Sequence, residues 1–279
     1  MCRVDDRCGW GARKKLFLKS MKRNNALRLQ IAEMVFKAGE GHIPSAYSIL
    51  EILSILYGHV LRYKSANPRW EKRDYFILSK GHGCAALYIL LEKHGFISRS
   101  DLEKKSTLGG ILGGHPDSTK VPGIEASTGS LGHGISIALG IALGLKIRKK
   151  KNKVITLIGD GESNEGTVWE AALVAANLSL GNLCVIVDEN GSADQILPVN
   201  PLRKKWQAFG WEVYEVDGHA EKKLLNLLTR LQFSLSGRPK VIIAHTIKGK
   251  GVRFMQGHGV WHSRVPTEEE MTMIREELL

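Results

Sequence analysis

Short apolar runs rich in β-branched residues alternate with helix-like segments in the second half of the chain, and this alternation restricts the possible folds most. The runs occupy residues 154–158, 183–187, 212–216 and 241–244, and the helix-like segments between them occupy residues 165–178, 202–209 and 220–235. Runs of about five apolar residues separated by helices are typical of a parallel sheet with helices on both faces. The sequence therefore predicts an α/β fold built on such a sheet.

The first half of the chain is mainly helical by its periodicity. Apolar residues recur at helical spacing in 45–60, 83–94 and 135–150, and an amphipathic helix starts near Asn24. Residues 1–20 carry charge, glycine and two cysteines without apolar periodicity. We expect residues 1–20 to be a disordered N-terminal extension and residues 21–279 to form one domain, with Met21 as a second candidate for the start of translation.

Composition argues against several classes of protein. No stretch approaches the roughly 18 to 20 uninterrupted apolar residues of a membrane span. The four cysteines are too few and too scattered for a disulfide framework or a zinc site, which favours the cytoplasm. The net charge is +12, but the basic runs lie at the ends of helix-like segments and no aromatic residues interleave with them. A solvated surface is therefore favoured over nucleic-acid binding.

Polar residues directly follow two successive strands of the predicted sheet. Gly159-Asp160-Gly161-Glu162 follows one strand, and Asn190 comes shortly after the next. Ligands of such sheets bind at the carboxyl ends of the strands. Mg²⁺ prefers carboxylate and other oxygen ligands together with phosphate oxygens, and glycines let the backbone approach a phosphate. The pairing of Asp160 with Asn190 therefore predicts a site for a metal and a diphosphate.

These residues belong to a series of motifs that resembles the transketolase family. Gly159-Asp160-Gly161 through Asn190 looks like the thiamine diphosphate motif of that family. Other matching motifs are Gly41-His42, Ser79-Lys-Gly-His82, Gly114-His115-Pro116, Ser127-Thr-Gly-Ser-Leu-Gly132, Glu165-Gly-Thr-Val-Trp-Glu170, His245-Thr-Ile-Lys-Gly-Lys-Gly251 and Trp261-His262. The resemblance runs from about residue 21 to the end, and the motifs occur in the family's order.

The resemblance implies a site for thiamine diphosphate and Mg²⁺, with Ca²⁺ or Mn²⁺ as alternative metals. The implied metal ligands are Asp160, Asn190 and the carbonyl of Ser192. The implied cofactor-binding residues are His82, Gly129, Ser130, Leu131, Gly159, Asp160, Gly161, Glu162, Asn190 and His262.

The resemblance also assigns roles to histidines. His82 would lie against the diphosphate and the thiazolium ring. His42, His115 and His262 would face the substrate as catalytic residues, because an imidazole can accept or donate a proton near neutral pH. Four others, His133, His219, His245 and His258, have no matching role and are interpreted as structural.

The implied activity is the transfer of a two-carbon ketol unit from a ketose or ketose phosphate to an aldose acceptor. Enzymes of the family use a glutamate from a second domain, which we expect on a separate C-terminal subunit, in an α2β2 heterotetramer. Glu165 and Glu170 match carboxylates that the family places at the subunit interface, although ordinary surface acids remain the alternative.

Two departures from the family pattern lie near the site. Pro44 and Ser45 stand where the family commonly has a glycine, and Ser192-Ala-Asp194-Gln195 replaces an apolar residue followed by Asp-Gly. The second departure puts the usual sugars in doubt more than the cofactor, so the substrate is expected to be a sugar phosphate or a modified sugar. Two other functions stay open: the α chain of a 2-oxoacid dehydrogenase, and a non-catalytic basic binding or regulatory chain.

Overall fold

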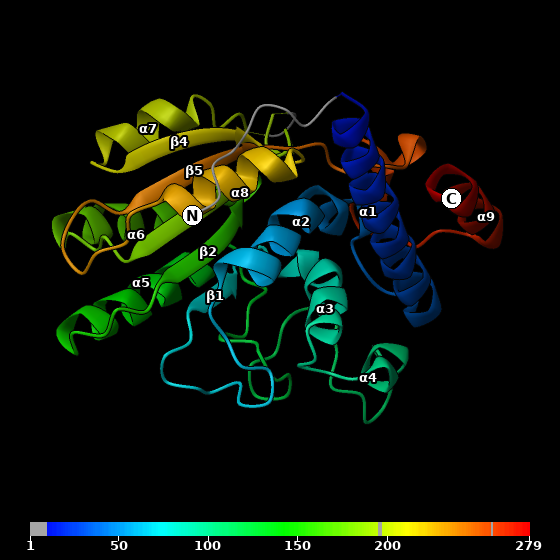
Figure 1. The fold of residues 1–279 in the computed structure, drawn as a ribbon, viewed down its shortest axis with the longest axis horizontal. Helices are drawn as coiled ribbons and strands as arrows, with labels where there is room; N and C mark the ends of the chain where they lie inside the picture. The colour runs from blue at the N-terminus through cyan, green and yellow to red at the C-terminus, as the bar shows by residue number, and fades with distance from the viewer. Residues whose placement is uncertain (1–9, 195–196, 258) are drawn as a thin grey trace.

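A five-stranded parallel sheet forms the centre of the protein (Figure 1). The computed structural model describes residues 10–194, 197–257 and 259–279. The strands lie side by side in the order β1-β2-β3-β5-β4, and all described pairings are parallel. Their bounds are β1 Tyr75–Leu78, β2 Val154–Gly159, β3 Leu183–Glu189, β4 Glu212–Asp217 and β5 Lys240–His245. The predicted fold class is confirmed.

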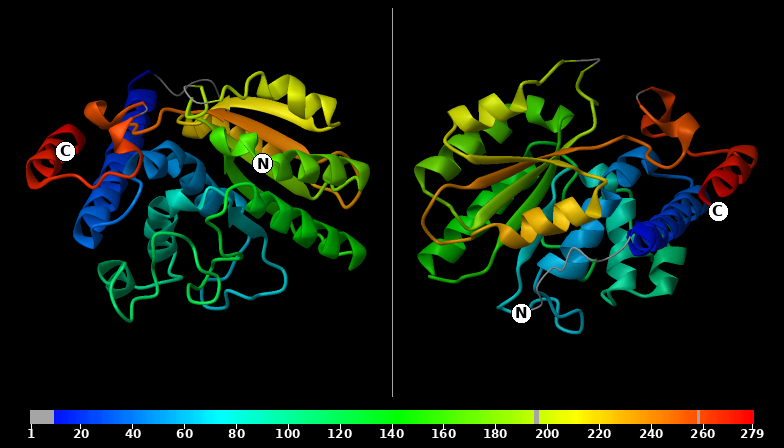
Figure 2. Two further views of the ribbon diagram at one scale, coloured as in Figure 1. Left: turned by 180° about the vertical axis from the view of Figure 1, so that it is seen from behind. Right: turned by 45° about the horizontal axis from the view of Figure 1, so that its top comes forward.

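Helices cover both faces of the sheet (Figures 1 and 2). One face packs against α5 (His133–Ile147), α6 (Gly166–Asn177) and α7 (Leu202–Ala208). On the other face lie α2 (Ile43–Ile55), α3 (Cys84–Lys93) and α8 (Glu221–Arg230), and α1 (Trp10–Ala38) packs against α2 and α3 away from the sheet. Successive strand residues point to opposite faces, so that Ile155 and Leu157 enter one core while Val154 and Ile158 enter the other. Burial on both faces explains why β2 and β3 read as continuous apolar runs, whereas the edge strand β4 is mostly half-buried and carries charged residues.

The first helix was expected to start near Asn24 but begins at Trp10, and the other predicted helices lie within about five residues of their expected bounds. The sequence reasoning missed three elements. These are β1, the short helix α4 (Arg99–Glu103) and the C-terminal helix α9 (Glu268–Leu278), which packs on α1 away from the sheet. Five single turns complete the described elements: η1 Leu56–Val60, η2 Gly81–Gly83, η3 Gly161–Asn164, η4 Arg253–Met255 and η5 Val260–His262.

Helix α1 begins at Trp10, inside the segment expected to be an extension. Residues 1–9 lie outside the described part of the chain, so the expectation for residues 1–20 stays a prediction.

Within the described residues, Ile43–Val60 is the one stretch with the length and hydropathy of a membrane span. It comprises α2 and η1, and 83% of it is buried inside the protein, as in the core helix of a globular domain.

Candidate cofactor and active site

A cavity of about 630 Å³ opens at the carboxyl edge of the sheet, beside the ends of β2 and β3. Many of the predicted cofactor and metal residues line it: His82, Leu131, Gly159, Asp160, Gly161, Glu162, Asn190, Ser192 and His262. Its volume lies in the range of pockets for small ligands. The segments that follow adjacent parallel strands meet here, as the position of Asp160 and Asn190 predicts.

Asp160 and Asn190 direct oxygen atoms to a common point. The backbone N–H of Ser192 donates both to Oδ2 of Asp160, at 2.9 Å, and to Oδ1 of Asn190, at 3.0 Å. The amide nitrogen of Asn190 donates to Asp188 at 2.8 Å, which turns the amide oxygen toward Asp160. A carboxylate oxygen and an amide oxygen from adjacent strand ends thus lie together.

The environment of Asp160 favours the arrival of a cation. Burial, followed by the negative charge of Asp188, raises the pKa of Asp160. Asp160 is only 2% exposed, and a carboxylate in such a place is stabilised by a nearby positive charge. Hard oxygen donors are what Mg²⁺, Ca²⁺ and Mn²⁺ prefer, so the residues present fit a divalent metal.

Glu162 lines the cavity and also bonds to the segments around it. One carboxylate oxygen accepts hydrogen bonds from the Ser79 hydroxyl and from the N–H of Gly132, and the other accepts from the N–H of Gly159 at 3.1 Å. Both oxygens are therefore engaged with the protein. Glu162 holds together the glycines that border the cavity.

Four histidines from four separate segments lie close together. The ring centroid of His42 is 5.4 Å from that of His82, 6.3 Å from that of His115 and 5.3 Å from that of His262. The centroids of His82 and His262 are 5.8 Å apart. The structure thus brings together the four histidines that the resemblance singled out.

Burial keeps two of these rings neutral. It lowers the pKa of His82 to about 2, with further lowering from the charge of Lys80. Burial also lowers the pKa of His42 to about 4, helped by His262 and His115. Nδ1 of His42 is buried and has no partner among the described residues. A neutral ring with an unpartnered nitrogen is ready to exchange a hydrogen bond with a ligand.

Other predicted residues are not among those that line this cavity. His115 is exposed, and a Cβ placed on Gly129 would lie 3.5 Å from its ring. Ser130 is exposed as well. Glu165 precedes α6, Glu170 lies within that helix, and both are exposed. Gln195 and His258 lie outside the described residues.

The sequence reasoning missed two buried lysines. Nζ of Lys80 lies 2.5 Å from Oδ2 of Asp188 in a fully buried ion pair. Nζ of Lys248 lies 3.3 Å from Oγ of Ser192 and 3.0 Å from Nδ1 of His262. Burial, followed by the charge of Lys80, lowers the pKa of Lys248. Both lysines lie inside motifs that match the family, Lys80 in Ser79–His82 and Lys248 in His245–Gly251. Their position in these motifs could have identified them as site residues.

Pro44 has a structural explanation. It stands in the first turn of α2, where a fixed φ suits the start of a helix and no amide hydrogen is needed. His42 is the residue before that first turn, and the carbonyl of Pro44 accepts a hydrogen bond from Gly249 at 3.0 Å. The proline therefore fixes the segment that carries a site histidine.

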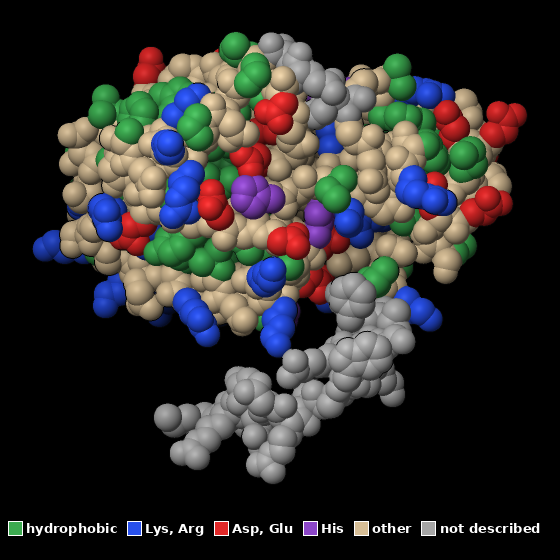
Figure 3. Space-filling model, turned by 90° about the horizontal axis from the view of Figure 1, so that it is seen from above, with side chains coloured by type: hydrophobic (Ala, Val, Ile, Leu, Met, Phe, Trp, Pro, Cys, Tyr) green, Lys and Arg blue, Asp and Glu red, His purple; other side chains and the backbone are tan. Residues whose placement is uncertain are grey.

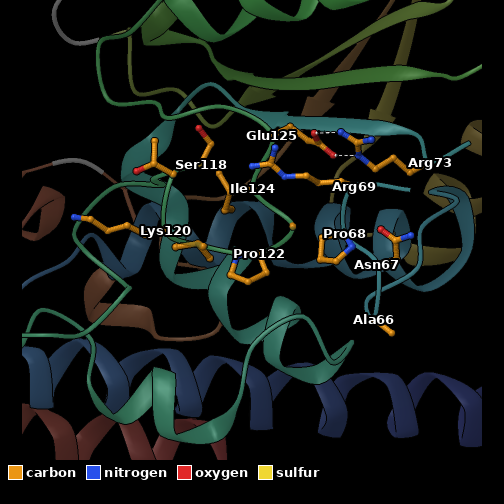
Figure 4. Close-up of a pocket in the computed structure, with 13 residues that line it drawn as sticks. Ala66, Asn67, Pro68, Arg69, Arg73, Ser118, Lys120, Pro122, Ile124 and Glu125 are labelled. Carbon is orange, nitrogen blue, oxygen red and sulfur yellow. Dashed lines mark hydrogen bonds and ion pairs between the residues drawn. The ribbon is translucent and has the colours of Figure 1, made fainter. Parts of the chain in front are cut away.

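A second cavity, of about 660 Å³, lies between residues 66–73 and 118–125 (Figure 4). None of the predicted site residues that the structure describes lines it. Its wall includes Arg73, whose guanidinium forms two hydrogen bonds to the carboxylate of Glu125, at 2.6 and 2.8 Å. The two cavities are similar in volume, so chemistry and not size distinguishes the candidate site.

Basic side chains are spread over the face of the molecule shown in Figure 3, with acidic side chains among them. Among the described residues, no single basic stripe runs across that face. This distribution agrees with a solvated surface.

The chain matches the family described as transketolase, thiamine diphosphate binding domain, over residues 20–278. It is 40% identical over 248 residues to an apulose-4-phosphate transketolase subunit of Phocaeicola vulgatus, covering 87% of this chain and 88% of that one. It is 38% identical over 250 residues to a 6-deoxy-6-sulfo-D-fructose transketolase subunit of a Clostridium species, covering 88% and 90%.

The fold is also found in solved transketolases. The structure of transketolase from Leishmania mexicana superposes with a TM-score of 0.86 at 29% identity, and that from Campylobacter jejuni with 0.85 at 30%. The match covers 92% of this chain in both cases, but only 41% and 42% of the solved chains. This chain therefore spans about two fifths of the length of those enzymes.

Proposed function

The chain belongs to the transketolase family, and on that premise we propose that it is the cofactor-binding subunit of a two-chain enzyme that transfers a two-carbon ketol unit from a ketose to an aldose. Its relatives of nearly equal length are named as transketolase subunits. The observation that carries the proposal is the meeting of Asp160 and Asn190 oxygens beside a cluster of neutral histidines.

Asp160, Asn190 and Ser192 would hold Mg²⁺, and the metal would hold the diphosphate of the cofactor. Lys80 and Lys248 line the same cavity and add positive charge on the diphosphate side. When bound, thiamine diphosphate supplies a carbon nucleophile and an electron sink for cleavage of a carbon–carbon bond.

The histidines supply the proton chemistry. A neutral His42, with its pKa lowered to about 4, can accept a hydrogen bond from a sugar hydroxyl at physiological pH. His115 is exposed, so a substrate could reach it. His82 is too deeply buried to charge readily, so it would orient the ligand through hydrogen bonds.

A partner chain would cover α5 and α6. These two helices pack on each other, and each leaves large apolar side chains exposed. The side chains are Ile137 and Ile147 on α5, Leu173 and Val174 on α6, and Leu178 directly after it. Exposed apolar groups on neighbouring helices are typical of subunit interfaces.

We propose that the partner is a C-terminal transketolase subunit that supplies the glutamate, in an α2β2 heterotetramer with two-fold symmetry. Glu165 and Glu170 are exposed at the start of α6 and in its first half, and they would join that interface.

We propose a substrate that carries an anionic group, such as a sugar phosphate or a sulfonated sugar. The names of the two relatives describe a phosphorylated and a sulfonated sugar. A net charge of +12 would attract such substrates. The described cysteines, Cys84 and Cys184, are buried free thiols, which supports the proposed location in the cytoplasm.

The other two functions are less well supported. A 2-oxoacid dehydrogenase chain has no evident use for the histidine cluster, and its signature would be oxoacid turnover with an acceptor. A regulatory chain has no evident use for the converging oxygens, and its signature would be ligand binding without dependence on Mg²⁺.

The test combines the purified chain with the C-terminal transketolase chain of the same organism. We expect weak cofactor binding and no ketol transfer by this chain alone, and both restored in the mixture. Robust transfer by the lone chain would contradict the two-chain assignment. Cofactor binding that is indifferent to Mg²⁺ would contradict the metal site.

A further inference from the structure

The turn after β4 places His219 between a buried carboxylate and a backbone amide. Nδ1 of His219 lies 3.0 Å from Oε2 of Glu51 on α2. Nε2 of the same ring accepts a hydrogen bond from the N–H of Ile247 at 2.9 Å. His219 and Glu51 are far apart in sequence, and only the fold brings them together.

These two contacts fix which nitrogen of His219 carries the proton. A backbone N–H can only donate, so Nε2 must have a free lone pair. An ionised carboxylate can only accept, so the proton must be on Nδ1. The ring is therefore neutral in the Nδ1–H form. At metal sites, a carboxylate often binds one nitrogen of a histidine and so orients the other nitrogen toward the metal. Here Glu51 binds Nδ1 of His219 in the same way, but Nε2 accepts a hydrogen bond from a backbone N–H.

Glu51 is well suited to hold the ring. Oε1 of Glu51 accepts a hydrogen bond from Nη2 of Arg28 at 2.6 Å, and the two side chains are only 5% and 4% exposed. Burial opposes ionisation of Glu51, but hydrogen bonds from His219 and the charge of Arg28 outweigh it and lower the pKa. The carboxylate therefore stays charged and acts as an acceptor.

The peptide group that His219 holds belongs to a segment that reaches the cofactor cavity. On one side of Ile247, the Thr246 hydroxyl donates to Asp188, the buried partner of Lys80. On the other side, Lys248 reaches Ser192 and His262. Gly218 lets the turn approach, since a Cβ there would lie 2.4 Å from Cγ2 of Thr246.

We propose that His219, in the Nδ1–H form supported by Glu51, is a positioning residue that holds the Ile247 amide and so directs Lys248 into the cofactor site and Thr246 onto Asp188. The consequence for the cofactor rests on the proposed function, whereas the protonation state and the hydrogen bond do not. Interpreting His219 as purely structural is thus too narrow.

The first test reads the proton position directly. ¹⁵N-labelled histidine in the intact chain should show His219 as neutral, with Nδ1 protonated and Nε2 unprotonated. His219 can be identified by the signal lost in His219→Gln. A protonated Nε2 in the folded chain would overturn the proposal.

The second test asks whether His219 acts through its hydrogen-bond acceptor or through the size of its ring. His219→Gln keeps an acceptor for the Ile247 amide, while His219→Leu removes it at similar size. We expect His219→Leu to weaken Mg²⁺-dependent thiamine diphosphate binding by about tenfold, the usual effect of losing one buried hydrogen bond. We expect His219→Gln to stay within about twofold of the unmodified chain. His59→Leu, at an exposed histidine outside the cavity, controls for the loss of a histidine.

Equal loss in the Gln and Leu variants would refute the role of the acceptor, as would unchanged binding by His219→Leu. If His219→Leu does not fold, the Gln variant and the proton position still decide. Both are measured without substrate, so they succeed or fail independently of ketol transfer. The absence of ketol transfer with the partner chain would contradict only the proposed function.

Discussion

Two buried carboxylates at opposite edges of the sheet, Asp74 and Asp160, have different kinds of partner. At the amino edge, Asp74 accepts hydrogen bonds from the Arg62 guanidinium, at 2.7 Å, and from the backbone N–H groups of Arg62 and Lys153. At the carboxyl edge, among the described residues, the carboxylate of Asp160 has only backbone donors and Nδ1 of His42 has no partner.

The difference separates groups that stabilise the fold from groups that await a ligand. Asp74 finds its countercharge within the chain, so its removal should affect folding. Asp160 is held by burial in a state that a metal would improve, so its removal should affect binding. Cavities of similar size lie in both regions, so volume alone does not distinguish them.

The largest expected effect is on stability at the amino edge. Asp74→Ala removes a buried carboxylate and leaves the partly buried N–H groups of Arg62 and Lys153 without this acceptor, so we expect a loss of about 3 kcal/mol in the free energy of unfolding. Urea denaturation measures it, with Glu71→Ala as the control because that side chain is 80% exposed. Cofactor affinity of the folded fraction should be unchanged. A weaker cofactor affinity would show that Asp74 does not act on stability alone.

Asp160→Ala should give the opposite pattern. We expect Mg²⁺-dependent thiamine diphosphate affinity to fall by at least about a hundredfold, the upper part of the range for disturbed metal sites. Because burial raises the pKa of Asp160, its removal should not lower the free energy of unfolding without cofactor. Calorimetric titration and urea denaturation measure the two effects. Asp194→Ala, at an exposed acid in the neighbouring segment, is the matched control.

His115→Ala sharpens the comparison within the carboxyl edge. We expect turnover of the donor sugar by the assembled enzyme to fall by about a hundredfold, as for the loss of a proton-transfer group. Cofactor affinity and stability should stay unchanged, because the side chain is exposed. The steady-state rate and a cofactor titration test this division. A loss of cofactor affinity as large as that of His82→Ala would show that the two histidines share one role.

The smallest expected effect concerns acid stability. The pKa of His42 falls from 6.5 in the unfolded chain to about 4 in the folded one, so below pH 6.5 the unfolded chain binds more protons. Stability is therefore complete above about pH 6.5 and declines as the pH falls toward 4. The full pKa shift would give about 1 kcal/mol between pH 6.5 and 5.5, and because the ring is partly exposed we expect a loss of about 0.5 kcal/mol. Denaturation of His42→Asn should show a flatter pH profile over this range; an identical profile would exclude His42 as the source.

Much of the fold was predictable because burial on both faces leaves a strong mark on the sequence. Strands β2 and β3 are continuous apolar runs, and their ends located Asp160 and Asn190. Strand β1 spans only Tyr75–Leu78 and gave no such signal. Helix α9 is highly charged, although the reciprocal cap of Thr267 and Glu270 at its start was a usable signal.

The rest of the site could not be predicted because it depends on distant contacts. Lys80 matters through Asp188, and His219 matters through Glu51 and Ile247. A sequence pattern shows which residues are neighbours along the chain, but not which distant residues the fold brings into contact. The same holds for Glu162, whose contacts with Ser79 and Gly132 join segments that are far apart in the sequence.

The exposed apolar side chains of α5 and α6 have a consequence for the cell. A newly made copy that has not yet met its partner presents Leu173 and Val174 to water, 52% and 43% exposed. Such surfaces attract one another and recruit chaperones and proteases. Surplus copies would therefore be cleared or would aggregate. We expect the cell to synthesise the two chains in matched amounts and to pair them soon after translation.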